Sequence, residues 1–140
     1  MSSLDERLLR FRTLNREMRL QMLLKYSKSF PELPGWLKEV RDEGLGRVEE
    51  CQTPLFLWVS VNDGGIVQIH ADAPREAPTV RGFVGFLMEV LNGQSAEAVA
   101  ALPDDLMERM GLDEVLGVMR TRGLGAVLYK VKKDAARAAA

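Results

Sequence analysis

The sequence predicts a single domain of the α+β class, in which a small, mostly antiparallel sheet packs against helices. Apolar residues recur at helical spacing near the N-terminus and again after residue 79. Two short apolar runs flank an Asn-Asp-Gly-Gly turn at residues 62–65, which is typical of a β-hairpin. The length of 140 residues suits one domain over residues 1–140, and the chain shows no internal repeat.

Composition narrows the class of protein further. Apolar residues make up 46% of the chain and charged residues 28%, which is ordinary for a soluble globular protein. The net charge of −1 provides no field toward nucleic acid or an anionic membrane. No apolar run approaches the ~18 residues of a membrane span, and the charged N-terminus lacks the apolar core of a secretion signal. We therefore expect a cytoplasmic protein that binds neither nucleic acid nor membrane.

The first predicted element is a helix over residues 3–25. Its apolar positions repeat every three or four residues, and polar Asn15 interrupts them. Proline and glycine then punctuate residues 30–46, which predicts a connector with at most one short helix.

The second unit is a loop and hairpin over residues 47–72, with strands at 55–61 and 66–71. The run Leu55–Val59 lacks polar alternation, which predicts a strand covered on both faces. A turn centred on Asp63 and Gly64 would place His70 opposite Leu57 and Asp72 near Leu55.

The remaining part, residues 79–136, is predicted to be helical. A helix from Thr79 to Leu91 contains Gly82 and Gly85, which disfavour a helix and so suggest close approach of another element. After short helices, the last helix is expected to begin near Thr121 as its cap and to fray in the alanine-rich tail.

Cys51 is the candidate reactive residue. It is the only cysteine, which excludes an internal disulfide and any cysteine-rich metal site within one chain, and no metal site is expected. A lone cysteine is more often a small packed hydrophobe, but its polar neighbours and Pro54 favour a thiol presented on a loop. The carboxylates of Glu49 and Glu50 disfavour a thiolate, so its activation must come from elsewhere in the fold or from a partner.

The sequence offers two candidate activators of this thiol. In the expected register His70 lies opposite a residue six positions beyond Cys51, roughly 20 Å along an extended strand, which disfavours a Cys–His dyad. Arg120 and Arg122 lie at the expected start of the last helix, where the helix dipole disfavours cations. Either they pair with a carboxylate, or they stabilise an anion such as a thiolate or persulfide.

Taken together, these residues resemble the SufE family of sulfur acceptor proteins. The resemblance covers about residues 47–132 and rests on three blocks in the family's order. These are Glu50-Cys51-Gln52-Thr53 before Leu55-Phe56-Leu57-Trp58, then Asp72 before Val80-Arg81-Gly82-Phe83, then Arg120 and Arg122 before Gly123-Leu124. Two departures are Glu50 in place of the family's glycine and a longer segment at Ala73–Pro78, and both bear on which partner binds.

The resemblance implies a SufE/NifU-like fold and an accessory protein rather than a stand-alone enzyme. Cys51 would accept persulfide sulfur from a SufS-like cysteine desulfurase, stimulate that enzyme and pass the sulfur to an iron–sulfur scaffold. No cofactor is expected, because the pyridoxal phosphate would belong to the desulfurase, and a homodimer is allowed. Arg120 would stabilise the anion, and Leu55, Trp58 and Phe83 would line a cavity for the sulfur. The expected loop or docking residues are Glu50, Gln52, Thr53, Asp72, Arg81 and Arg122.

Two other functions remain open at this point. One is an iron–sulfur scaffold of the related U-type fold, although such sites generally need about three cysteine ligands and this chain has one. The other is a non-catalytic interaction domain in which the cysteine is incidental.

Overall fold

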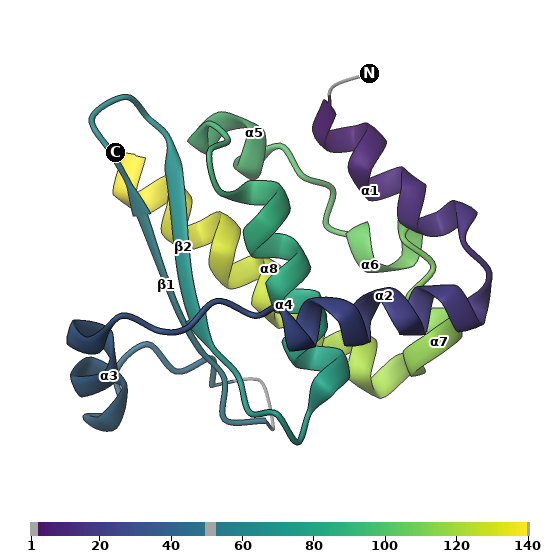
Figure 1. Ribbon diagram of the computed structural model, residues 1–140. Helices are drawn as coiled ribbons and strands as arrows, with labels where there is room; N and C mark the ends of the chain where they lie inside the picture. Colours follow the sequence, from purple (N-terminus) through teal and green to yellow (C-terminus); the bar gives the residue numbers. More distant parts are fainter. Residues whose placement is uncertain (1–2, 50–52, 140) are drawn as a thin grey trace.

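The computed structural model describes residues 3–49 and 53–139, and it shows a β-hairpin beside a group of helices (Figure 1). This arrangement confirms the α+β class. In chain order the elements are α1 (Ser3–Thr13), α2 (Arg16–Lys28), α3 (Gly35–Asp42), β1 (Phe56–Val61), β2 (Val67–Asp72), α4 (Pro78–Leu91), α5 (Ala96–Ala100), α6 (Leu106–Arg109), α7 (Asp113–Leu116) and α8 (Val118–Ala139).

The core forms around α4, which packs against α2 and against β2, while α8 packs against β1 and α5. Nine of the fourteen residues of α4 are buried, because neighbours cover it on several sides. The buried face of α8 consists of Thr121, Leu124, Val127, Leu128, Val131 and Ala135. In the described ranges, no helix combines the length and the hydropathy needed to cross a bilayer.

Residues 3–25 form two helices rather than the single one expected. Asn15 has an extended backbone between α1 and α2, and its side chain accepts a hydrogen bond from the Met18 amide at 2.9 Å. Asparagine is among the best residues at a helix N-cap, so the polar position that interrupts the apolar pattern starts a new helix.

The predicted hairpin is confirmed, but its register differs by one residue. Trp58 faces His70 and Phe56 faces Asp72, whereas the expected partners were Leu57 and Leu55. The cause is the turn. The Asn62 side chain accepts hydrogen bonds from the amides of both Gly64 and Ile66, which closes a five-residue loop centred on Gly64 instead of between Asp63 and Gly64.

Strand β1 is covered on one face only, which corrects the expectation of cover on both faces. Leu57 is buried, while Phe56 and Trp58 on the opposite face are partly exposed. Both edges of β1 nevertheless have hydrogen-bond partners. One edge of β1 pairs with β2. The other edge pairs, at the beginning of β1, with the segment 46–48 through a bridge between Arg47 and Phe56.

Helix α8 begins earlier and ends later than expected. Gly117 has a φ of +83°, which ends α7 and lets α8 begin at Val118 instead of Thr121. The Thr121 hydroxyl donates back to the Gly117 carbonyl at 2.6 Å from inside the first turn. The helix continues through the alanine-rich tail to Ala139, and Ala135 is fully buried against the core. The alanine-rich end of the chain is therefore part of the domain.

Candidate functional site

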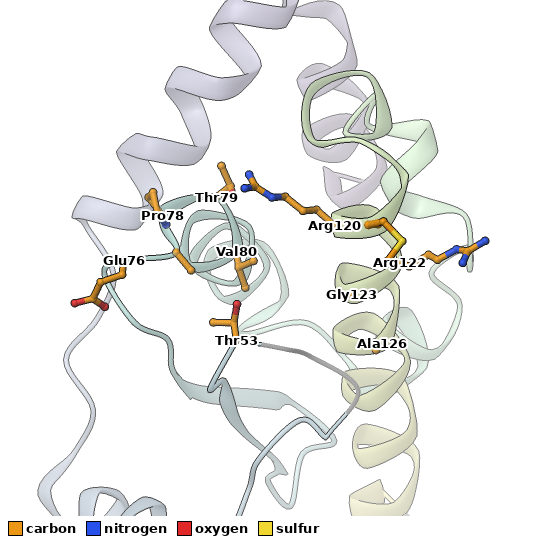
Figure 2. Close-up of a pocket in the computed structure, with 11 residues that line it drawn as sticks. Thr53, Glu76, Pro78, Thr79, Val80, Arg120, Arg122, Gly123 and Ala126 are labelled. Atoms are coloured by element: carbon orange, nitrogen blue, oxygen red, sulfur yellow. The ribbon is translucent and has the colours of Figure 1, made fainter.

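A pocket of about 680 Å³ lies where three segments far apart in the sequence meet (Figure 2). Thr53 contributes from the segment that leads into β1, and α8 contributes from its first turns. The third segment is the approach to α4 together with its first turn. The lining residues are Thr53, Glu76, Ala77, Pro78, Thr79, Val80, Met119, Arg120, Arg122, Gly123 and Ala126.

The predicted reactive loop adjoins this pocket through Thr53. Glu50, Cys51 and Gln52 lie outside the described residues, and the structure describes the chain again from Thr53. A single residue separates Cys51 from Thr53, so the covalent chain holds their Cα atoms within about 7 Å of each other. Of the four residues predicted from this loop, Thr53 is therefore the one that the structure places, and it lines the pocket.

The beginning of α4 gives the pocket a positive wall. Ala77 occupies the cap position and offers no side-chain acceptor, and Pro78 follows at the start of the helix. The first amides of a helix have no partner within the helix, and its N-terminal end carries a partial positive charge. Because Thr79 and Val80 both line the pocket, this end of α4 favours a bound anion there.

Arg120 adds a full positive charge on the α8 side. In Figure 2 its side chain extends toward Thr79, across from Thr53, whereas the guanidinium of Arg122, which also belongs to the lining, extends away from both threonines. Within the part of the chain that the structure describes, neither arginine forms an ion pair, so the salt-bridge alternative finds no support there. Glu76 is the one acidic side chain among the described lining residues, and its carboxylate points away from the other labelled side chains (Figure 2).

Two other predicted site residues do not line the pocket but form contacts between the segments next to it. Asp72, at the end of β2, accepts a hydrogen bond from Arg41 of α3 at 3.0 Å. Arg81 donates to the backbone carbonyls of Ser27 and Ala73, and its guanidinium lies 4.3 Å above the Phe30 ring.

The contacts of Arg81 have a consequence for the pocket rim. Burial lowers the pKa of Arg81, and the charge of Arg75 lowers it further. Through Ser27 and Ala73, Arg81 ties the segment 73–77 to the end of α2. Because that segment continues into the pocket lining at Glu76, Arg81 acts as a support for the rim.

The three residues expected to line a cavity for the sulfur do not line this pocket. Leu55 and Phe83 are fully buried in the core, and Trp58 lies on the other face of the hairpin, where it packs against Gly46. The apolar lining of the pocket, which the sequence pattern does not predict, consists of Ala77, Pro78, Val80, Met119, Gly123 and Ala126. Pro78 is the sequence signal for the start of α4, because proline favours the first position of a helix.

His70 lies away from this pocket and is not among its lining residues. It sits opposite Trp58 in the hairpin, with its ring centre 6.2 Å from that of Trp36. Across residues 3–49 and 53–139, no cluster of three His, Cys, Asp or Glu side chains could hold a metal ion.

Comparison with known proteins agrees with the motifs. The family model described as SufE, an Fe-S metabolism associated domain, matches residues 5–135. The chain is 38% identical over 115 residues to an uncharacterized SufE-like protein of Mycobacterium tuberculosis, covering 82% of this chain and 78% of that protein. It is 30% identical over 112 residues to the sulfur acceptor protein CsdE of Escherichia coli, covering 79% of this chain and 72% of that one.

A solved structure is also similar. The solution structure of a hypothetical protein from Thermus thermophilus superposes with a TM-score of 0.80 at 38% sequence identity. The match covers 96% of this chain and 94% of the other. The similarity therefore extends over the whole fold.

Proposed function

The chain belongs to the SufE family, and we propose that it accepts persulfide sulfur from a cysteine desulfurase onto Cys51. The observation that carries the proposal is the pocket beside Thr53, in which the N-terminal end of α4 and the guanidinium of Arg120 meet. An anion is the ligand that such a wall favours, and both a thiolate and a persulfide are anions.

The transfer is a thiol exchange without net oxidation. The Cys51 thiolate attacks the outer sulfur of the donor's cysteine persulfide and forms a new S–S bond. The original S–S bond breaks, and its electron pair leaves on the donor's cysteine sulfur as a thiolate. The negative charge thus passes from Cys51 to the donor, and Cys51 becomes the persulfide. One cysteine in the acceptor is sufficient, because the other sulfur atoms belong to the partner.

The pocket supplies the positive charge that the acidic loop around Cys51 lacks. Glu49 is exposed and Glu50 is its neighbour in sequence, and their charges disfavour a thiolate nearby. The Arg120 guanidinium and the first amides of α4 favour the same thiolate, because opposite charge and N–H donors stabilise an anion. We propose that this balance keeps Cys51 reactive, and that its persulfide later passes to an iron–sulfur scaffold. The pyridoxal phosphate that releases sulfur from cysteine would belong to the desulfurase.

Intact mass spectrometry tests the proposal directly. The protein is incubated with a SufS-like cysteine desulfurase and L-cysteine, and its mass is then measured with and without a reductant. We expect one added sulfur atom that reductant removes. If no adduct forms with any desulfurase tried, the chain is an interaction domain. Iron uptake by the protein without the sulfur adduct would instead favour the U-type scaffold.

Replacing Arg120 by alanine is expected to slow sulfur acceptance about tenfold at saturating donor. The change removes one positive charge from the anion site. Loss of one hydrogen-bond donor from a buried catalytic site lowers the rate constant about a hundredfold, and the effect should be smaller here because Arg120 is exposed. Thermal unfolding should be unchanged, because Arg120 is exposed and lacks an ion pair among the described residues. The measurement is the rate of adduct formation by mass.

Arg16→Ala is the control for this experiment. It removes an exposed arginine at the start of α2 that does not line the pocket and has no ion pair among the described residues. Its maximal rate should equal that of the wild type. Equal maximal rates for Arg120→Ala and Arg16→Ala would rule out the role given to Arg120.

A further inference from the structure

Helix α8 is one of two basic parts of this acidic chain. It holds six cationic side chains and one anionic side chain, a net charge of +5, whereas the whole chain has a net charge of −1. Residues 3–28 carry +4, so residues 29–117 carry −10. The charge therefore favours an acidic partner at α8 and at the N-terminal helices, and of these two parts only α8 contributes to the described lining of the pocket beside Thr53.

Three of the exposed cations of α8 form a line with Ala126 and two large apolar side chains. We call this line the α8 stripe: Met119, Arg122, Ala126, Tyr129, Lys133 and Arg137. Their spacings of three and four residues place them on one face of the helix, opposite the buried face. From its first to its last residue the stripe extends about 27 Å along the helix axis, at a rise of about 1.5 Å per residue.

The α8 stripe is unlike an ordinary solvated helix face. Elsewhere on α8, Lys130 pairs with Asp134 and Lys132 pairs with Asp104, both at 2.8 Å. The stripe's own cations have no carboxylate partner among the described residues, and Lys133 instead lies 5.7 Å above the Tyr129 ring. Met119 and Tyr129 are 73% and 65% exposed, and large exposed side chains beside such cations are typical of a binding surface.

The α8 stripe also begins at the site. Its first residues, Met119, Arg122 and Ala126, contribute to the lining of the pocket beside Thr53. A protein that reaches this pocket with its persulfide can therefore extend along α8 without leaving the surface. The length of the stripe suits one side of a standard interface, which buries about 800 Å² per partner.

We propose that the α8 stripe is the docking surface for the sulfur donor, and that the donor presents to it a carboxylate-rich surface with an apolar centre. This inference rests on the proposed function and names the part of the acceptor that recognises its partner. Opposite charges speed the encounter and orient it, so the donor's persulfide arrives at the pocket end of the stripe. A protein partner is favoured over nucleic acid, because the stripe has an apolar centre and the chain as a whole is acidic.

A charge-reversal pair tests the proposal away from the pocket. The double variant Lys133→Glu/Arg137→Glu is compared with Lys25→Glu/Lys28→Glu, which changes the net charge equally at exposed positions of α2. Sulfur acceptance from a SufS-like desulfurase is measured against acceptor concentration, at low and at high salt. We expect the α8 variant to need about ten times more acceptor for half-maximal rate at low salt, with its maximal rate unchanged. High salt should reduce this difference, because the screening length falls to about 3 Å at 1 M. The α2 variant should remain within about twofold of the wild type.

The outcomes separate this proposal from the proposed function. If the wild type acquires sulfur and the two double variants show equal half-saturation, docking on α8 is refuted while sulfur acceptance stands. If the wild type acquires no sulfur, the proposed function fails, and calorimetric titration of the three proteins with the desulfurase still decides whether α8 binds it. Displacement of the desulfurase by an equimolar DNA duplex would overturn the assignment to a protein partner.

Tyr129 provides a test that does not depend on charge. Tyr129→Ala removes an exposed ring and should raise the half-saturating acceptor concentration several-fold, while Tyr129→Phe should leave it close to the wild-type value. Both variants should unfold at the wild-type temperature, since the side chain is exposed. Equal effects of the two substitutions would exclude the ring as an anchor.

Discussion

Replacing Cys51 by serine is expected to abolish sulfur acceptance completely. Serine is close in size to cysteine, so the substitution changes the chemistry of the side chain with little change in its shape. Its hydroxyl is not ionised near neutral pH, and the attacking species in this exchange is a thiolate. Intact mass after incubation with a desulfurase and L-cysteine should show no added sulfur. Because Cys51 is the only cysteine, no other thiol of the chain can take its place.

A relocated thiol provides the control for this loss. The double variant Cys51→Ser/Ser60→Cys carries its single cysteine at an exposed position of β1. It should react with a small alkylating reagent but should not restore sulfur acceptance, because a thiol at position 60 lacks the pocket and its positive wall. Full activity of the double variant would show that any exposed thiol suffices, and the role proposed for the pocket would then be wrong.

Replacing Gly82 by alanine is expected to destabilise the fold by about 3 kcal/mol, because overpacking a well-packed interface costs about 1–3 kcal/mol or more. A Cβ on Gly82 would collide with the backbone carbonyl of Leu23 in α2. Backbone atoms of a packed helix cannot rotate away as a flexible side chain can, so α2 and α4 must separate. Urea denaturation of the purified variant measures the change in the free energy of unfolding.

Gly123→Ala is the matched control for the glycine substitution. Gly123 is also inside a helix, but a Cβ there would meet no atom within 4 Å. Alanine should therefore stabilise the protein, by up to about 1 kcal/mol, through its better helix propensity. If both glycine variants showed the same free energy of unfolding, the collision would not limit the packing of α2 on α4.

Local chemistry explains which elements could be predicted. The hairpin follows from its turn residues, and α4 follows from an apolar face that ends at Asn92 and Gly93. The close approach inferred from Gly82 and Gly85 is confirmed by the packing of α4 against the carbonyls of Leu23 and Tyr26. In each case the signal lies within a few residues of the feature that it predicts.

Structural details that depend on one or two hydrogen bonds could not be predicted from the sequence pattern. The break at Asn15 depends on its side chain bonding the Met18 amide rather than facing solvent inside a longer helix. The hairpin register depends on the Asn62 side chain enclosing one more residue than a tight turn would. The helix continues through the tail because Ala135 packs in the core, a contact that the sequence pattern of the tail does not show.

By itself, the sequence determined that this chain is an α+β member of the SufE family with one candidate sulfur-accepting residue. Ordered motifs around Cys51, Arg81 and Arg120 carry that information. Only the tertiary structure decided which of these residues share a site. It brings Arg120 and the first turn of α4 together beside Thr53, and it assigns Arg81 and Asp72 to supporting contacts. The physical reason is that a pocket forms where α4, α8 and the start of β1 pack together, and such packing depends on residues far apart in the chain.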